Sequence, residues 1–394
     1  MADEDRAFVE ELRDWLTEHL VGEFKAAGAV GGPTDDSHWE LRLAWERALA
    51  QGRWLNVSWP REYGGRSGTA RQELLFHIEH AAVEAPYWVG VQGRDLFGPT
   101  LLEFGTPDQQ RRFLPRITAC EEMWGQGFSE PDAGSDLAGL KTRARLDGDE
   151  WVVDGQKVWT TFGHRADWLY VLCRTNEQPP KHRGISMLLV PRHQPGVDVR
   201  TIRNLAGGEE FCEVFFDGAR TAAANVVGAV DAGWTVVMGT LGNERAGATV
   251  LPFQAMFQRE MAHLIEVARD RGVHRHPVVR QRLAAAWAGL RVMELNNDRL
   301  LGAVLRGEHP GPESSIGKLY WANWHRTFGE LMVDVLGMDA VAGLGDRGAD
   351  AVAALAAPMV RSFLNARAET IYGGANEIQR NIVGERVLGL PKGP

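Results

Sequence analysis

The apolar residues in the first part of the chain repeat at helical spacing. Two stripes are formed by Phe8, Leu12, Trp15, Leu16 and Leu20, and by Leu41, Trp45, Ala48 and Leu49. A repeat of three and four residues is typical of a helix with one buried face. Similar patterns predict helices over Arg71–Ala82 and Pro107–Thr118. Residues 1–121 are therefore predicted to form a helical domain.

From residue 122 to residue 230 the pattern changes to short runs rich in β-branched and aromatic residues. These runs are Trp151–Val153, Trp168–Cys173, Ile185–Val190 and Phe211–Phe216. Turn signals separate them, namely Asp147-Gly148, Asp154-Gly155, Pro179-Pro180, Pro195-Gly196 and Gly207-Gly208. This arrangement predicts a central β domain of the barrel or sandwich type.

Long helical patterns return after Trp234. Val278–Leu305 and Pro312–Leu336 each exceed 20 residues, and the first carries a stripe formed by Val279, Leu283, Trp287, Leu290 and Met293. Long antiparallel helices of this kind form a four-helix bundle, predicted here for residues 231–394. Both helices have more apolar residues and tryptophans than one buried face needs, which predicts a dimer or tetramer through the bundle. The fold class is therefore α+β, in three domains.

Composition narrows the class of protein further. The chain of 394 residues is 44% hydrophobic and 24% charged, with a net charge of −9, so it is globular and has no basic face for nucleic acid. Its cysteines, Cys120, Cys173 and Cys212, are too far apart for a disulfide framework or a zinc site. The acidic start is unlike a signal peptide, and no apolar stretch reaches 18 residues. We expect a cytoplasmic protein without a metal or a membrane span.

Two segments of the β domain have residues suited to a flat ligand. Gly125–Asp136 combines small residues, which allow close approach to the backbone, with hydroxyls and carboxylates. In Val153–Thr161, alternation along a strand places Trp159 and Thr161 on one face, where they could cover a heterocycle. A polar loop and a core tryptophan are the alternatives.

A third segment, Thr370–Arg380, combines two glycines with a helix start. Asn376 is a good N-cap, and Gln379 completes a capping-box pattern. The free N–H groups of such a start can hold anionic or carbonyl atoms. An ordinary loop is the alternative.

Together and in this order, the three segments resemble the signatures of the acyl-CoA dehydrogenase family, and the resemblance covers nearly the whole chain. It implies FAD held between the β domain and the bundle. On this sequence the implied flavin contacts are Gln126, Phe128, Ser129, Trp159, Thr161, Gly374 and Asn376. Ser135 is expected near the pantetheine arm of the thioester.

The reaction that this resemblance implies is α,β-dehydrogenation of an acyl thioester, which needs a carboxylate as base. Many family members carry the base directly after Ile-Tyr, where this chain has Gly373. A subset, including isovaleryl- and long-chain-type enzymes, carries it on a bundle helix before an arginine. Glu244 and Arg245 match that place, as base and substrate contact respectively. A surface helix carboxylate is the alternative reading of Glu244.

Two departures from the family pattern concern the adenosine end of FAD. Arg271–Pro277 keeps the first arginine and the proline of an Arg-x-x-Phe-Gly-x-Pro element but has His274-Arg275 for Phe-Gly. Asp334–Met338 lacks the amide and the second glycine of Gln-x-x-Gly-Gly. Arg271 is retained as a FAD contact. The adenosine is held differently, or a paralogous subunit completes the site.

The resemblance also implies an electron-transferring flavoprotein as acceptor, and no Gly-x-Gly-x-x-Gly fingerprint for NAD follows a strand. Two rival functions stay open. One is a flavin oxygenase or oxidase on the same fold, and the other is a non-catalytic partner subunit of a hetero-oligomeric dehydrogenase. The acyl group, and the choice between CoA and a carrier protein, are not given by the sequence.

Overall fold

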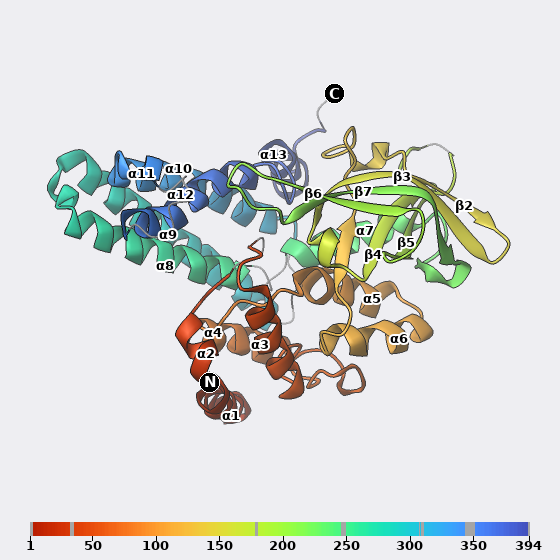
Figure 1. Ribbon diagram of the computed structural model, residues 1–394, viewed down its shortest axis with the longest axis horizontal. Coiled ribbons are helices and arrows are strands. Elements are labelled where there is room, and N and C mark those ends of the chain that lie inside the picture. Colours follow the sequence, from red (N-terminus) through yellow and green to blue (C-terminus); the bar gives the residue numbers. More distant parts are fainter. Residues whose placement is uncertain are drawn as a thin grey trace. The chain divides into compact units, whose positions relative to one another are not determined.

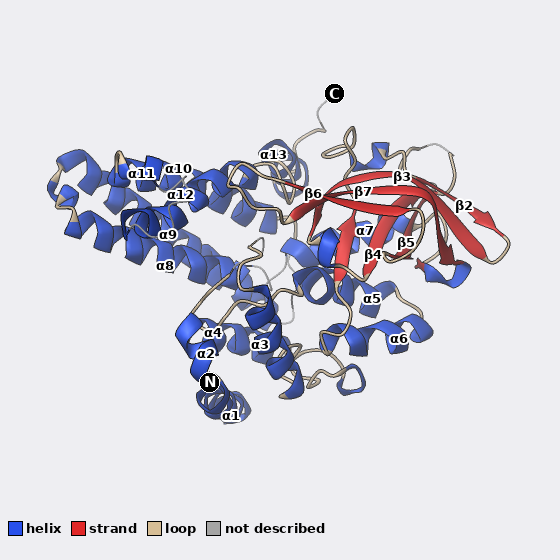
Figure 2. Ribbon diagram, in the orientation of Figure 1, coloured by secondary structure: helices blue, strands red, loops and turns tan. Residues whose placement is uncertain are grey.

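The computed structural model describes residues 3–31, 35–177, 180–245, 250–306, 308, 311–342 and 351–392. Within the helices, the side chains of residues 243–245, 250–252, 304–305, 342 and 351–355 are outside this description. The chain forms two compact units, Met1–Glu244 and Arg245–Pro394. The strands belong to the first unit, and the second is helical (Figures 1 and 2).

The first unit begins with helices that match the predicted pattern. They are α1 (Asp3–His19), α2 (Gly22–Ala27), α3 (Trp39–Gln51), α4 (Ala70–Ala82), α5 (Gly98–Phe104) and α6 (Pro107–Thr118), with a 3₁₀ turn η1 (Arg61–Tyr63) and a π-helix η2 (Gln92–Phe97). Capping boxes start α4 and α6, where Thr69 pairs with Gln72 and Thr106 with Gln109. These caps satisfy N–H groups that a helix start leaves free, so both helices begin where the sequence indicates.

The strands form one eight-stranded sheet. They are β1 (Trp124–Gly127), β2 (Arg143–Asp147), β3 (Glu150–Thr161), β4 (Trp168–Arg174), β5 (Ile185–Pro191), β6 (Val197–Ile202), β7 (Phe211–Ala222) and β8 (Val226–Val227), with 3₁₀ turns η3 (Leu137–Gly139), η4 (Gly163–Arg165) and η5 (Ala223–Asn225). The order is β6-β7-β3-β2-β4-β5-β8, and β1 pairs with β4 in parallel. All other neighbours are antiparallel except β2 and β4.

The prediction of a turn at Asp154-Gly155 was wrong. Strand β3 runs through this pair, and a register shift against β7 lies between Val153 and Gly155. A Cβ atom at Gly155 would lie 2.7 Å from the Cα atom of Thr142. The glycine therefore permits close approach of the backbone inside a strand, which is the other common reason for a glycine at such a position.

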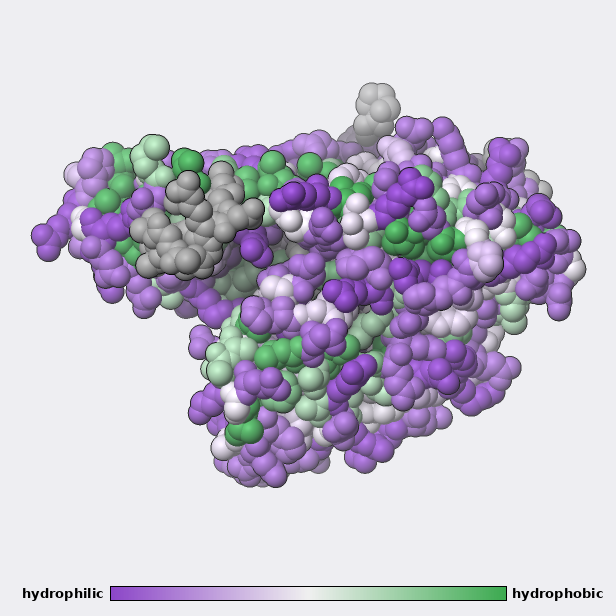
Figure 3. All heavy atoms as spheres, viewed as in Figure 1, coloured by the Kyte–Doolittle hydropathy of each residue, from purple (hydrophilic) through white to green (hydrophobic). Residues whose placement is uncertain are grey.

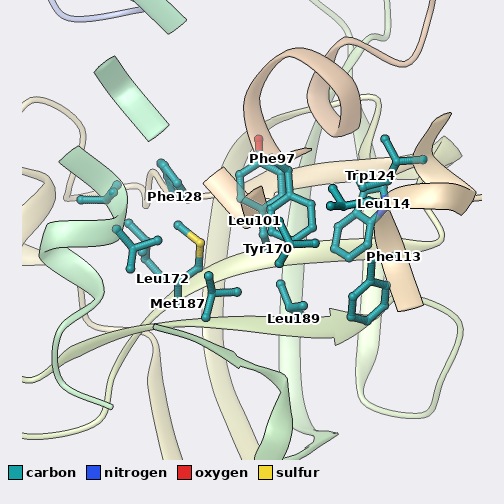
Figure 4. Packing of buried hydrophobic residues seen from close by; sticks show 14 of the residues in the cluster. Phe97, Leu101, Phe113, Leu114, Trp124, Phe128, Tyr170, Leu172, Met187 and Leu189 are labelled. Atoms are coloured by element: carbon teal, nitrogen blue, oxygen red, sulfur yellow. The ribbon is translucent and has the colours of Figure 1, made fainter. Parts of the chain in front are cut away.

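The core of the first unit joins its helices to its sheet (Figure 4). Phe97, Leu101, Phe113 and Leu114 from the helical part pack with Tyr170, Leu172, Met187 and Leu189 from β4 and β5. Helix α7 (Gly233–Arg245) adds Val236 and Val237 to the same cluster. Thr240 of α7 also accepts a hydrogen bond from Thr100 at 2.9 Å. The backbone that leads to Glu244 is thus fixed by a packed core.

The second unit contains the predicted helical bundle. Its helices are α8 (Val250–Asp270), α9 (Pro277–Leu305), α10 (Ser314–Leu336), α11 (Asp339–Ala342), α12 (Ala351–Glu369) and α13 (Asn376–Ile382), with η6 (Val273–Arg275) and η7 (Val383–Val387). Phe257, Leu290, Phe328 and Met359 are among its core residues. In the described residues no helix is long and apolar enough to cross a membrane.

Trp287 of helix α9 was predicted to lie in the same apolar stripe as Leu290 and Met293, but it faces solvent. Leu290 and Met293 of the predicted stripe are buried, but Trp287 is 54% exposed. Val278, Val292 and Leu295 of the same helix are exposed as well. In the view of Figure 3 the surface is mostly hydrophilic, and hydrophobic residues reach it over parts of the bundle.

Candidate active site

The first candidate segment starts on β1, which places Gln126 opposite Tyr170 of β4. Gln126 is half-buried, and its Nε2 atom is buried without a hydrogen-bond partner among the described residues. A buried amide group without a partner costs about 1–3 kcal/mol. A buried polar atom of this kind calls for an explanation, and a bound ligand is one of those that are generally considered.

The first two segments lie side by side. The backbone N–H of Val158 donates to the carbonyl oxygen of Ser129 at 2.9 Å. The Nζ atom of Lys157 donates to the carbonyl oxygen of Phe128 at 3.1 Å. The structure therefore brings Gln126, Phe128 and Ser129 next to the strand that carries Trp159 and Thr161.

A buried ion pair, which the sequence analysis did not identify, supports this arrangement. Lys157 is fully buried, and its Nζ atom lies 2.8 Å from Oε1 of Glu130. Glu130 also accepts hydrogen bonds from the backbone N–H groups of Lys141 (2.6 Å) and Thr142 (2.8 Å). A lysine inside an apolar strand, with a glutamate in the adjoining segment, is the sequence signal that could have indicated it.

The ion pair shifts the pKa values of both partners. Burial would raise the pKa of the Glu130 carboxyl, but the charge of Lys157 and the donated hydrogen bonds outweigh it, so that pKa is lowered. Burial lowers the pKa of Lys157, and Glu130 opposes this shift. The Lys157–Glu130 contact therefore fixes the loop after β1 to β3.

Trp159 is exposed and its backbone is strained. The side chain is 58% exposed, and φ is 63°, in the left-handed region. A bulky residue in this region is an outlier, at a cost of about 1–3 kcal/mol. The register shift between Lys157 and Thr160 marks a β-bulge here, so the regular alternation assumed for this strand is interrupted. Bulges commonly re-aim a side chain beside a functional site.

The residues around Trp159 divide between core and surface. Thr160 is buried, and its Oγ1 atom has no hydrogen-bond partner among the described residues. Thr161 is half-buried and lies opposite Phe211 of β7, whose ring meets that of Trp159 edge-on at 6.0 Å. The exposed indole of Trp159 and the buried hydroxyl of Thr160, which has no hydrogen-bond partner among the described residues, thus belong to neighbouring residues at one end of β3.

Ser135 lies in an exposed bend near the end of the first segment. Its neighbour Asp136 forms an ion pair with Lys181 at 2.6 Å. Both partners are largely exposed, so this pair contributes little to stability.

The C-terminal segment folds differently from the predicted capping box. Ala375, not Asn376, is the N-cap of α13, and no side chain caps this helix. Gly373 (φ 62°) and Gly374 (φ 90°) turn the chain one residue earlier than expected. The Gln379 amide donates to the carbonyl oxygens of Gly373 (2.9 Å) and Gly374 (3.3 Å). The glutamine closes the loop instead of capping the helix.

Asn376 is buried at the first position of α13. Its Nδ2 atom donates to Oδ1 of Asn323 at 3.1 Å. Its Oδ1 atom and Oε1 of Gln379 are buried without hydrogen-bond partners among the described residues. Like Gln126, these two side chains keep polar capacity for another group.

Arg271 has contacts within its own chain. It donates to the carbonyl oxygen of Leu336 at 2.9 Å and forms an ion pair with Asp339. Asp334, in the stretch that departs from the family pattern, pairs with Arg282. These contacts tie the α8–α9 connection to the end of α10.

Glu244 and Arg245 are the last two residues of α7. Their side chains, and therefore the contacts predicted for the base and the substrate arginine, lie outside the described residues. Glu244 follows the buried Thr240 by four residues, about one helical turn.

Comparison with known proteins gives a consistent result along the chain. Residues 2–121, 125–219 and 231–388 match the N-terminal, middle and C-terminal domains of acyl-CoA dehydrogenase. The chain belongs to the acyl-CoA dehydrogenase family. It is 47% identical over 389 residues to acyl-CoA dehydrogenase IpdE1 of Mycobacterium tuberculosis, covering 98% of this chain and 97% of the relative.

Two solved structures have the same fold over the whole chain. The ChsE4-ChsE5 complex from Mycobacterium tuberculosis is 31% identical with a TM-score of 0.81, covering 100% of this chain and 99% of that chain. The structure named Tcur3481-Tcur3483 steroid ACAD is 28% identical with a TM-score of 0.82, at the same coverage. The chain is thus an oxidoreductase of the acyl-CoA dehydrogenase type, a flavoprotein class of lipid metabolism that depends on FAD. Neither rival function is better supported by these matches.

Proposed function

We propose that this chain binds FAD noncovalently and uses it to convert an acyl-CoA thioester into the 2-enoyl thioester. Two observations on adjoining segments carry the proposal: the buried Gln126 Nε2 atom has no hydrogen-bond partner among the described residues, and Trp159 is exposed and strained. The Val158–Ser129 hydrogen bond joins these two segments. Donors without partners beside an exposed indole suit a planar heterocycle with polar edges.

The residues present fit FAD in two places. In the first unit, Gln126, Phe128 and Ser129 would contact the pyrimidine side of the flavin, Trp159 would cover it, and Thr161 would bond near N5. In the second unit, the free Oδ1 atom of Asn376 and the backbone at Gly374 would meet the cofactor. Arg271 would contact FAD only through guanidinium atoms not used by Asp339 and Leu336.

In the proposed reaction, Glu244 removes the α-proton of the thioester and holds it on its carboxylate. When bound, FAD would supply the acceptor for the hydride that leaves the β-carbon. The α,β double bond then forms from the electrons of the broken α C–H bond. Gly373 has no side chain to act as a base, so Glu244 is the proposed catalytic base. Hydrogen-bond donors must stabilise the enolate charge on the thioester oxygen.

We propose a bulky, ring-bearing acyl group as substrate. The relatives named as steroid ACAD, at 28% and 29% identity, support this proposal. The absence of a side chain at Gly373 leaves space that a glutamate fills in other family members. Ser135 and Arg245 are the proposed contacts of the thioester, and CoA is the proposed carrier.

We further propose that the chain works in an assembly with itself or with a paralogous subunit, as the name of the ChsE4-ChsE5 complex indicates for that relative. The exposed Val278, Trp287, Val292 and Leu295 of α9 support an interface on the bundle. An electron-transferring flavoprotein is the proposed acceptor.

The test is reconstitution with FAD, followed by anaerobic mixing with straight-chain, branched and ring-bearing acyl-CoA thioesters. We expect flavin absorption and bleaching by a ring-bearing thioester. The chain should be purified alone and together with a paralogue, since bleaching only in the second case identifies a shared site. Flavin that no acyl-CoA bleaches, but that oxygen reoxidises rapidly after dithionite reduction, would favour an oxidase.

A further inference from the structure

An ion cluster lies buried in the second unit, around His325 of α10. Its Nδ1 atom lies 2.7 Å from Oε2 of Glu369, and its Nε2 atom lies 2.8 Å from Oε2 of Glu260. The hydroxyl of Ser362 lies 3.1 Å from Nε2. His325 and Glu369 are buried, and Glu260 is half-buried. One imidazole thus links α10 to both α8 and α12.

The imidazole carries a positive charge in this setting. Burial alone would lower the pKa of His325, but Glu260 and Glu369 together raise it to about 10. A buried ion cluster is seldom a net source of stability, because desolvation offsets the attraction between its charges. In this unit the cluster joins defined positions of α8, α10 and α12.

The element fixed here is the end of α12. Glu369 is the last residue of that helix, and the Gly373-Gly374 loop follows directly. The backbone carbonyl oxygen of Glu369 accepts a hydrogen bond from Nζ of the buried Lys318 at 2.7 Å. Helix α10 therefore holds both the side chain and the carbonyl group of the residue that precedes the loop.

Helix α10 also holds the other end of the loop. Asn323 accepts a hydrogen bond from Nδ2 of Asn376 at 3.1 Å, and its own amide donates to the carbonyl oxygen of Leu319 at 2.6 Å. The backbone N–H of Asn376 donates to the carbonyl oxygen of Thr370 at 3.0 Å, which closes the loop. Both ends are thus fixed to the same helix, while Ile371 between them is 69% exposed.

We propose that His325, Lys318 and Asn323 are positioning residues for the loop of residues 370–375. Through Glu369 and Asn376 they hold Gly373 and Gly374 in the orientation that the cofactor and the thioester require. This inference rests on the proposed function for the role of the loop, but not for its anchoring. The anchoring can therefore be tested in protein without flavin.

The test compares two substitutions at the same imidazole. Glu369→Gln and Glu260→Gln each remove one carboxylate charge from His325, but only Glu369 is joined to the loop. Hydrogen exchange of the full-length protein without flavin is measured by mass spectrometry, on peptides covering 368–380 and α8. We expect Glu369→Gln to speed exchange in the loop about tenfold, while Glu260→Gln leaves the loop within about twofold of wild type.

Lys318→Met is the second variant, because it removes the bond to the Glu369 carbonyl and leaves both carboxylates in place. It should speed loop exchange in the same peptide. Equal loop exchange in wild type, Glu369→Gln and Lys318→Met would overturn the proposal. The proposal would also be overturned if loop exchange in every variant, Glu260→Gln included, rose only in proportion to the loss of melting temperature. A cluster that only stabilises the fold would give that result.

A second readout uses the flavin-loaded protein. At saturating thioester, Glu369→Gln should slow flavin reduction about tenfold or more, because small misplacements of a site are costly, and Glu260→Gln should change it less than about twofold. A wild type that no thioester bleaches would contradict the proposed function, and the exchange experiment would still decide the anchoring. Flavin reduction that is slowed equally in Glu369→Gln and Glu260→Gln would contradict the positioning role.

Discussion

Replacement of Lys157 by methionine tests the charged contact that joins the first two candidate segments. Methionine keeps most of the side-chain volume but removes the ammonium group, and with it the bonds to Glu130 (2.8 Å) and to the Phe128 carbonyl (3.1 Å). Glu130, only 7% exposed, then keeps a negative charge with no cation beside it.

The expected loss follows from the burial of both partners. Removal of one member of a buried ion pair costs about 3–5 kcal/mol in free energy of unfolding, because the other charge is left without its partner. The two backbone N–H groups that bind Glu130 offset part of this cost, so we expect about 3 kcal/mol. The double variant Lys157→Met/Glu130→Gln removes both charges and should recover at least about 1.5 kcal/mol of it.

Urea unfolding, followed by tryptophan fluorescence, measures these differences for wild type, both single variants and the double variant. Protein concentration must be equal, since the stability of an oligomer depends on it. FAD affinity should fall in Lys157→Met, because the Phe128–Ser129 loop loses its Lys157 bond to β3 and retains the Val158 bond. Additive effects, with a coupling below about 0.5 kcal/mol, would refute the reasoning.

Three further predictions follow from the site and the bundle. Glu244→Gln should lower flavin reduction about 10²–10⁴-fold with FAD binding retained, and near-normal reduction would remove Glu244 from the mechanism. Trp159→Ala should weaken FAD binding, measured by titration, yet change apoprotein stability by less than about 1 kcal/mol, because the indole is 58% exposed. His325 has a pKa of about 10 when folded and about 6.5 unfolded. Its contribution is complete below pH 6.5 and is lost as pH rises to 10, so melting temperature should fall more across this window in wild type than in His325→Gln.

The regular elements were predictable because their patterns are local. Pro107–Thr118 is a helix with the predicted bounds, and the runs that start at Trp168 and Ile185 became β4 and β5. Periodicity failed where an element departs from regular geometry. The 12-residue strand β3 contains two register shifts, at Gly155 and at Trp159, and no pattern of apolar residues encodes a bulge.

The candidate site was predictable as segments but not as contacts. Gln126, Ser129 and Trp159 were singled out, yet the contacts that join their two segments include the Lys157–Glu130 ion pair, whose members lie 27 positions apart in the chain. The capping box at Asn376 was wrong for a related reason. The positive φ angles of Gly373 and Gly374 shift the helix start, and Gln379 then binds loop carbonyls that no local pattern specifies.

Buried polar atoms without partners indicate residues retained for binding more clearly than the sequence motifs do. Among the described residues, eight buried side-chain nitrogen or oxygen atoms have no hydrogen-bond partner, and four of them belong to Gln126, Thr160, Asn376 and Gln379. All four lie in the three short segments that carry the family resemblance. Folding alone selects against such atoms, since each costs about 1–3 kcal/mol. Their concentration there is what a chain selected to bind a polar-edged ligand would retain.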